Sequence, residues 1–386
     1  MDQSPLHQQV ETLPDLVRVM VGDLEQRVNE TFSRTLCQKI QRVHITGCGD
    51  SHHAALNVEL AFEQLAGLPC EPYTAMQFGR YAAPFLPDAG KGGNLVLGVS
   101  VSGQVSRTIE ALDLGRQAGA ITAAITGRLQ APLAQVSDFV LETAVPPLPD
   151  ELAGLIVPGT RSYFASQLAL FVLAIHLGRQ RDHLTKARAA KLQLELSATA
   201  DLMEETISNC DSVSYKAAQS WQDEDSFVYC GSGPNFGTAS FSAAKILEAS
   251  GDAAMAQDIE EWAHLQYFAR QNRTPTILIS AAERDMDRAI EIATAAHRIG
   301  RQVAIIAPSN SRLAKISVKE FVFPLAGTLR ECFSPLVASL PGILFASHRA
   351  QILGEPYFRN FGGGRSAVGG GGISRIQDSH RITLLR

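Results

Sequence analysis

The chain has 386 residues, of which 45% are hydrophobic and 19% are charged. This composition is typical of a globular protein and excludes a mainly disordered or fibrous one. With 34 Lys and Arg against 39 Asp and Glu, the formal net charge is −5 and no basic run is present, which argues against nucleic-acid binding. At roughly 150 residues per domain, the length predicts two large domains or three small ones.

No segment predicts a membrane or secretory protein. The longest strongly apolar stretch, Leu168–Leu177, is about half the ~20 residues that a membrane span needs, so we expect a buried helix. The N-terminus carries acidic residues and no apolar signal-peptide core. The 6 cysteines are scattered without a CxxC pair, as is typical of reduced thiols. We therefore expect a cytoplasmic protein without membrane association.

The first half of the chain alternates between strand and helix patterns. Apolar residues at helical spacing predict one long amphipathic helix in the first forty residues. Continuous apolar runs then alternate with amphipathic segments, which indicates a parallel sheet covered on both faces. The predicted strands are Val43–Gly47, Cys70–Thr74, Asn94–Ser100, Ile121–Thr126 and Asp138–Leu141, with helices that include Ser51–Ala66 and Val105–Gln117.

The second half repeats this layout after a segment, from about Thr160 to Asn209, that we interpret as a long helical connector. The predicted strands are Ser226–Cys230, Thr276–Ser280, Gln302–Ala307 and Glu320–Pro324, and the predicted helices are Asn235–Ser250, Asp285–Ile299 and Arg330–Leu353. Each half contains a strand, a GxG turn and a helix in succession, in ITGCGDSHHAAL and in VYCGSGPNFGTA. This similarity indicates an internal duplication.

The predicted fold class is therefore α/β, with two doubly wound domains that each hold a parallel sheet flanked by helices. Residues 1–208 would form the first domain, including the N-terminal helix, and residues 209–355 the second. Residues 356–386 would form a tail. Its glycine-dense stretch Asn360–Ile373 is either a floppy end or a lid that closes over a site.

The first motif with possible chemistry is Gly47–Ser51, which follows a strand and opens a helix. Glycines let the backbone approach an anion, and a helix N-terminus offers N–H groups with a positive dipole end. A dinucleotide-binding turn is one interpretation, but His52 replaces the third glycine of GxGxxG. A simple tight turn between strand and helix is the other interpretation.

Hydroxyl groups gather in a second loop, Ser100–Thr108, directly after a predicted strand. Its sequence SVSGQVSRT brings hydroxyls and backbone amides to the beginning of a helix. Such neutral donors at a helix N-terminus are suited to a phosphate group. Helix capping explains one serine but not the SxSG cluster, so we favour a phosphate-binding loop.

Together with Lys245–His264, these two motifs resemble the sugar isomerase (SIS) domain family over about residues 40 to 355. The chain is most similar to the tandem-SIS isomerase module of glucosamine-6-phosphate synthase and to its stand-alone relatives. The resemblance implies two SIS domains, a sugar-phosphate substrate and no cofactor. The residues that it implies for substrate and phosphate binding are Gly49, Ser51, Ser100, Ser102, Gly103, Gln104, Ser106, Thr108 and Thr160. Val105 stands where the family usually has threonine, and Ser106 is the hydroxyl that would substitute for it.

Lys245 and Glu248 are three positions apart and so share one face of a predicted helix. Taken alone, the spacing favours a surface ion pair. The resemblance implies instead that Glu248 and His264, sixteen positions later, form a catalytic pair. A carboxylate can move a proton between adjacent sugar carbons, while a histidine transfers the ring-oxygen proton and Lys245 stabilises the oxyanion. In the family this histidine comes from the other subunit, which implies a homodimer.

Two further features limit the chemistry. The synthase relatives carry a lysine near the C-terminus, whereas this chain has Arg375 in the corresponding stretch, and an arginine cannot form a Schiff base. His52 and His53 lack Cys or Asp partners at metal-binding spacing, so we predict no metal site.

The resemblance implies proton transfer between C1 and C2 of a sugar or amino-sugar 6-phosphate. The reaction would be aldose–ketose isomerisation, deamination of an amino-sugar phosphate, or breakdown of a fructosamine-type phosphate. We expect no glutamine amidotransferase activity, because the length leaves no room for a glutamine-hydrolysing domain beside two SIS domains. A non-catalytic sugar-phosphate sensor is the alternative, which the presence of both Glu248 and His264 disfavours.

Overall fold

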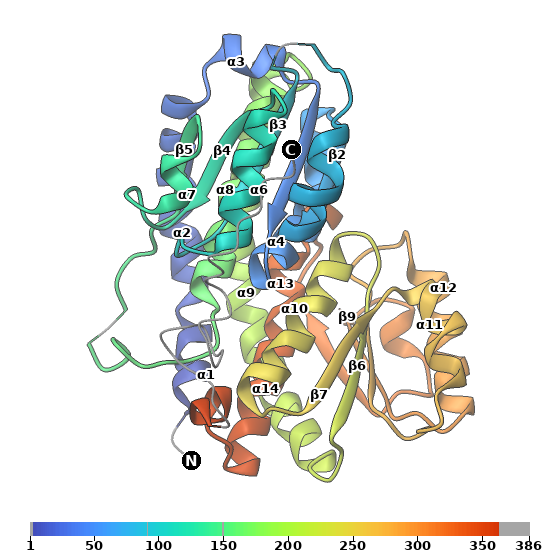
Figure 1. Cartoon of the computed structure of the whole chain (residues 1–386). Coiled ribbons are helices and arrows are strands. Elements are labelled where there is room, and N and C mark those ends of the chain that lie inside the picture. Colours follow the sequence, from blue (N-terminus) through green and yellow to red (C-terminus); the bar gives the residue numbers. More distant parts are fainter. Residues whose placement is uncertain (1–2, 91, 149, 363–386) are drawn as a thin grey trace. The chain divides into compact units, whose positions relative to one another are not determined.

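The computed structural model describes residues 3–90, 92–148 and 150–362, which form two compact units (Figure 1). Unit 1 comprises the described residues of Met1–Pro14, Pro147–Thr160 and Thr199–Asn360. Unit 2 comprises those of Asp15–Pro146 and Arg161–Ala198, with the described residues that follow Asn360. Residues 363–386, which hold most of the predicted tail and Arg375, lie outside the described part of the chain.

This division differs from the predicted boundary near residue 208. The N-terminal helix α1 (Pro5–Glu11) packs against α14 (Leu340–Leu353) in unit 1, not against the first sheet. The reason is apolar burial, because Leu6 and Val10 of α1 are both wholly buried. Unit 1 is therefore built from three separate stretches of the chain.

Each unit contains one sheet of five parallel strands (Figure 1). Unit 2 has the order β2-β1-β3-β4-β5, from β1 (Arg42–Gly47), β2 (Cys70–Thr74), β3 (Asn94–Val99), β4 (Ile121–Thr126) and β5 (Phe139–Glu142). Unit 1 has the order β7-β6-β8-β9-β10, from β6 (Ser226–Cys230), β7 (Ala253–Gln257), β8 (Thr276–Ile279), β9 (Val303–Pro308) and β10 (Phe321–Leu325). Numbered within each unit, both orders are 2-1-3-4-5. The predicted α/β fold with two doubly wound domains is confirmed.

Helices cover both faces of the unit 2 sheet. On one face, Val96 and Ala124 of the sheet pack with Ala111 and Leu112 of α6 and with Phe78. On the other face, α4 contacts β1 and α8 contacts β4. The helices of this unit are α2 (Leu13–Thr31), α3 (Arg34–Lys39), α4 (Asp50–Ala61), α5 (Ala75–Gln77), α6 (Ser106–Gln117), α7 (Pro132–Gln135) and α8 (Arg161–Gln180), with π-helical turns at Phe62–Ala66 and Phe78–Ala82. Burial on both faces explains the continuous apolar runs of the strands.

The unit 1 sheet is enclosed in the same way. Trp262 and Met286 pack with Val228 and Leu278 on one face, while Phe345 contacts the Phe227 ring on the other. The helices here are α10 (Pro234–Ala249), α11 (Ile259–His264), α12 (Met286–Arg298), α13 (Pro335–Ala338) and α14, and the long helix α9 (Lys186–Ser220) belongs to unit 1 from Thr199 onward.

Three predicted helices are shorter than expected. The N-terminal segment forms α1, α2 and α3, because Ser4 and Ser33 each cap a new helix and Pro14 lacks the N–H that a continuous helix needs. The segment from Thr160 to Asn209 breaks between α8 and α9, where Asp182 has a φ of 62°. The stretch predicted as Arg330–Leu353 divides into a short 3-10 turn, α13 and α14, with prolines near the beginning of both α-helices.

One described helical stretch, Glu331–Leu353, has the length and apolar composition to cross a membrane. Within the protein, 83% of its most apolar window is buried. A core helix of a folded domain has the same character.

Glu59 on α4 is expected to make the stability of unit 2 depend on pH. Burial, together with the neighbouring charges of Glu63 and Glu71, raises the pKa of Glu59 to about 7. Because the folded-state pKa lies above the ordinary value of 4.5, the stabilising contribution is complete below pH 4.5 and is lost as the pH rises through 7. Glu59→Gln should therefore raise the free energy of unfolding at pH 8 by about 1–2 kcal/mol, allowing for partial exposure, with no gain at pH 4.

Differential scanning calorimetry of the Glu59→Gln variant at pH 4 and pH 8 measures this effect. The control is Glu30→Gln, which removes an exposed carboxylate of α2 in the same unit. If both variants gain a similar free energy of unfolding, or if Glu59→Gln gains the same amount at both pH values, the pH dependence does not come from Glu59.

Candidate functional site

The sheet of unit 2 places the two predicted loops side by side. Its strand order reverses between β1 and β3, which pair in parallel with Gly47 opposite Val99. In open α/β sheets, ligands bind beyond the carboxyl ends of the strands at such a switch point. The turn Gly47–Ser51 follows β1 and the loop Ser100–Thr108 follows β3, so the fold brings both to this position.

The turn after β1 exposes the beginning of a helix. Gly49 is the N-cap residue of α4, with φ 54° and ψ −129°, and no side chain caps this helix. Ser51 lies half-buried in its first turn. A Cβ on Gly47 would lie 2.8 Å from Ser51 Cβ, which requires glycine there. In unit 1, Gly233 has nearly the same geometry before α10, with φ 53° and ψ −131°, as an internal duplication predicts.

The loop after β3 is held in a fixed turn. The Gly103 amide donates to the Ser100 carbonyl at 3.0 Å, and the Gln104 amide donates to Ser102 Oγ at 3.3 Å. Gly103 has a φ of 62°, and a Cβ there would lie 2.4 Å from Ala131 Cβ. Ser100 is buried, Ser102 is half-buried and Gln104 is exposed. Backbone and hydroxyl groups are thus fixed beside the sheet edge, as phosphate binding needs.

The helix that follows this loop supplies two of the predicted hydroxyls. Its N-cap residue Val105 provides no side-chain cap, and the half-buried Ser106 begins α6. Thr108 is wholly buried, and its hydroxyl donates to Cys48 Sγ at 3.7 Å. Thr108 therefore connects the two loops, while Ser106 keeps partial access to solvent.

The donors around this loop are mostly neutral. The guanidinium groups of Arg107 and Arg80 both pair with the Glu110 carboxylate, whose side chain is 2% exposed. Burial and the neighbouring charge of His53 lower the pKa of His52 to about 4, so its ring is uncharged near pH 7. An anion at this edge would be held chiefly by amides, hydroxyls and the α4 and α6 dipoles.

In unit 1, α10 holds Lys245 and Glu248 together. The Lys245 ammonium is wholly buried and forms an ion pair with the Glu248 carboxylate. It also donates to the Gly159 carbonyl at 3.2 Å and lies 4.8 Å from the centre of the Phe241 ring. The Glu248 side chain is 30% exposed, so the pair combines a buried cation with an accessible carboxylate. The surface ion pair that spacing alone favoured is wrong for Lys245, because the segment at Gly159 and the Phe241 ring cover it.

Thr160 lies in unit 1, unlike the other predicted phosphate-binding residues. It is 1% exposed, and its hydroxyl donates to Gln9 Oε1 at 3.1 Å. Thr160 follows the residue whose carbonyl holds Lys245. The roles of Gly159 and Phe241 were not predicted, although Phe241 is one helical turn before Lys245 and this spacing was a signal for contact.

His264 lies in the last turn of α11, with its side chain 61% exposed. Its Nε2 atom lies 3.1 Å from Glu260 Oε1, and Arg288 binds the same carboxylate. The following residues Leu265 and Phe268 are large and apolar, yet 57% and 76% exposed. His264 is thus presented on a surface that is part apolar.

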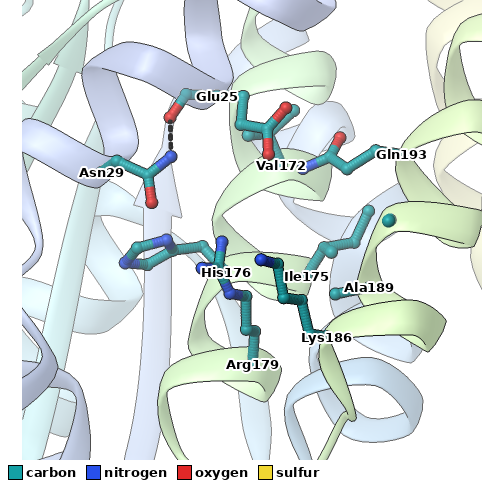
Figure 2. Close-up of a pocket in the computed structure, with 10 residues that line it drawn as sticks. Glu25, Asn29, Val172, Ile175, His176, Arg179, Lys186, Ala189 and Gln193 are labelled. Atoms are coloured by element: carbon teal, nitrogen blue, oxygen red, sulfur yellow. Dashed lines mark hydrogen bonds between the residues drawn. The ribbon is translucent and has the colours of Figure 1, made fainter.

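A cavity of about 140 Å³ in unit 2 is separate from these residues (Figure 2). It is lined by α2, α8 and the beginning of α9, with Glu25, Asn29, His176, Arg179 and Lys186 among its residues. The Asn29 amide donates to the Glu25 carbonyl at 2.7 Å (Figure 2). None of the predicted site residues lines this cavity, and it is made by helices rather than by strand ends.

Comparison with known proteins bears on the fold. Residues 36–177 match the family model described as SIS domain. The chain is 25% identical, over 351 residues, to the glutamine–fructose-6-phosphate aminotransferase (isomerizing) of Gloeobacter violaceus, covering 90% of this chain and 55% of that protein. The chain thus spans about half the length of the curated relatives that it matches.

Two solved structures extend the likeness to both units. The C-terminal domain of glucosamine-fructose-6-phosphate aminotransferase from Francisella tularensis superimposes with a TM-score of 0.79 at 18% identity, covering 92% of this chain and 98% of that one. Glucosamine-6-phosphate deaminase from Thermotoga maritima gives a TM-score of 0.67 at 18% identity, covering 91% and 95%. The resemblance to tandem SIS proteins, drawn from the motifs, is confirmed.

Proposed function

We propose that this protein is a phosphosugar isomerase that moves a proton between C1 and C2 of a sugar or amino-sugar 6-phosphate. The observation that carries the proposal is the buried Lys245 ammonium that holds the accessible Glu248 carboxylate. The SxSG loop at the switch point of unit 2 supports a phosphorylated substrate. The structural relatives include a glucosamine-6-phosphate deaminase, which favours an amino-sugar phosphate and release of ammonia.

In this proposal Glu248 is the base. Removal of a proton from the carbon beside a carbonyl leaves negative charge on oxygen, and a carboxylate serves both adjacent carbons in turn. The Lys245 ammonium, fixed by Gly159 and Phe241, stabilises the enolate-type oxyanion. In this proposal the loop residues from Ser100 to Ser106 of unit 2 bind the phosphate and supply no step of the proton transfer.

His264 is proposed to transfer the ring-oxygen proton in a homodimer, with each histidine acting in the site of the partner subunit. Its 61% exposure suits a residue that reaches a second chain. The exposed Leu265 and Phe268 beside it provide apolar surface for an interface between copies.

The test is proton NMR of the purified protein in D2O with hexose and amino-hexose 6-phosphates. Deuterium incorporation at C1 or C2 with release of ammonia identifies a deaminase, and incorporation without ammonia identifies a simple isomerase. The absence of exchange for the whole panel, in a protein whose Tm rises with these phosphates, would contradict the enzyme and support a sugar-phosphate sensor.

Ser102→Ala is expected to weaken binding of a hexose 6-phosphate by roughly 10–100-fold, because a hydrogen bond to a charged group is worth about 1.5–3 kcal/mol. Isothermal titration calorimetry with fructose 6-phosphate and glucosamine 6-phosphate measures the change. Ser137→Ala removes a half-buried hydroxyl elsewhere in unit 2 and should leave the affinity unchanged. Equal affinities for wild type and Ser102→Ala would exclude this loop as the phosphate site.

A further inference from the structure

A cluster of metal-binding side chains lies in unit 1, and none of its members belongs to the proposed phosphosugar site. His7 comes from α1, Asp211 from α9 and His348 from α14. One ligand atom from each lies within 4.8 Å of the others. No local sequence pattern indicates this grouping, because 348 − 7 = 341 positions separate the two histidines.

From this geometry we propose that His7, Asp211 and His348 bind one divalent transition-metal ion of the zinc class. Two imidazoles and one carboxylate are a donor set that zinc and related first-row ions prefer. The cluster leaves a fourth position for water, which can reach it because the Asp211 side chain is 43% exposed.

The distances between the donor atoms suit such an ion. His7 Nδ1 lies 3.5 Å from Asp211 Oδ1, and His348 Nε2 lies 2.6 Å from the same oxygen. In a tetrahedral site with bonds near 2.0 Å, neighbouring ligand atoms are roughly 3.3 Å apart. One observed distance is longer than this value and the other is shorter. A small increase in the distance between His348 Nε2 and Asp211 Oδ1 would therefore admit the ion.

The burial and the neighbours of His7 and His348 favour metal binding at these side chains. His7 and His348 are only 3% and 9% exposed, so their rings are held in place by the packing of α1 on α14. The second ring nitrogen of His7, Nε2, lies 3.7 Å from Glu11 Oε1. A carboxylate behind the non-binding nitrogen is the usual partner of a metal-bound histidine, and it orients the ring.

The consequence is structural. The three ligands belong to helices at the beginning, middle and end of the chain, so one ion would fix α1 against α9 and α14 (Figure 1). Metal binding to the folded form alone raises the stability of that form. We therefore expect zinc to raise the Tm of unit 1.

The experiment uses the full chain, stripped with a chelator and reloaded with Zn²⁺ or Co²⁺. We expect one equivalent of zinc per chain after gel filtration, measured by mass spectrometry, and visible absorption bands on loading with Co²⁺. Asp211→Asn and His348→Gln should each weaken zinc binding by at least roughly 10-fold and remove the increase in Tm. His297→Gln, which removes an exposed histidine of α12, should leave both zinc binding and the zinc-dependent increase in Tm unchanged.

The outcomes separate the possibilities. Retention of the full equivalent in both Asp211→Asn and His348→Gln would place the metal elsewhere and overturn the proposal. The absence of bound zinc in the wild type, with a Tm that depends on pH through these residues, would show a proton-linked histidine cluster instead. Circular dichroism of each stripped variant confirms that it is folded before its metal content is compared.

Discussion

Glu248→Gln is expected to lower the rate of proton exchange on the true substrate by roughly 10²–10⁴-fold, the range that a general base contributes. The glutamine amide has the shape of the carboxylate but does not accept a proton. Single-turnover exchange in D2O, followed by NMR, measures the change directly. Because the substitution acts on the transfer step, we expect kcat to fall much more than KM rises.

A stability measurement must accompany this variant. Removal of the carboxylate leaves the buried Lys245 ammonium with the Gly159 carbonyl and the Phe241 ring as its remaining protein contacts identified above. A buried charge that loses its partner destabilises the fold. The rate loss counts as catalytic only if the variant melts above the assay temperature and still binds the phosphosugar. An undiminished exchange rate in such a folded variant would rule out Glu248 as the base.

His264→Gln provides a second and sharper control for the proposed dimer. If each active site takes Glu248 from one chain and His264 from the other, a mixture of the two inactive variants regains some complete sites. Random association of equal amounts gives half heterodimers, each with one complete site, and so about a quarter of the wild-type activity. No recovery after co-refolding would contradict a site shared between subunits.

Arg349→Met is expected to cost about 3–5 kcal/mol in the free energy of unfolding of unit 1. Arg349 is 1% exposed, and its guanidinium binds Asp252 Oδ2 at 2.5 Å and the Trp221 carbonyl at 2.7 Å. It also binds the Glu224 carbonyl and lies 4.6 Å from the centre of the Phe227 ring. Methionine fills most of the volume but removes the guanidinium donor from the part-buried Asp252 carboxylate and from the Trp221 and Glu224 carbonyls.

Tryptophan fluorescence during urea unfolding reports this loss for unit 1 alone. The chain has 2 tryptophans, Trp221 and Trp262, and both are buried in unit 1. Arg312→Met is the matched control, since Arg312 is also an arginine of unit 1 that forms ion pairs, with Glu283 and Asp287, but its side chain is 56% exposed. Its loss should cost much less, because ion pairs on the surface contribute little to stability. Equal costs for the two variants would show that burial of the Arg349 network adds nothing.

The fold was largely predictable where strands are buried on both faces. The strand β3 ends within one residue of the prediction, because a continuous apolar run leaves little ambiguity. The strand β7 was missed, since its residues are exposed or half-buried at the sheet edge and AAMAQ shows no apolar run. Helix α11 was also missed. It has six residues, although Asp258 followed by Glu260 and Glu261 is a recognisable helix beginning.

The candidate site was predictable only where its residues are close in sequence. The SxSG loop and the Lys245–Glu248 pair are local sequence patterns. In the structure a hydrogen bond within the loop and an ion pair on α10 hold these residues in place. The burial of Lys245 depends on Gly159, which is 86 positions away, so no local pattern reports it. The His7, Asp211 and His348 cluster depends on the packing of three distant helices, which only the folded chain shows.

The division of unit 1 into three stretches of chain affects how the protein is made. The ribosome releases α1 first, but its partner α14 follows 340 − 11 = 329 positions later. At 5–20 residues per second, this delay is roughly 15–65 seconds. During this time the unit 2 stretches Asp15–Pro146 and Arg161–Ala198 are synthesised, while Leu6 and Val10 have no apolar surface of α14 to cover them. A nascent or truncated chain that ends near residue 208 therefore exposes the apolar face of α1. The risk of aggregation during synthesis comes from this N-terminal helix rather than from the most recently made residues.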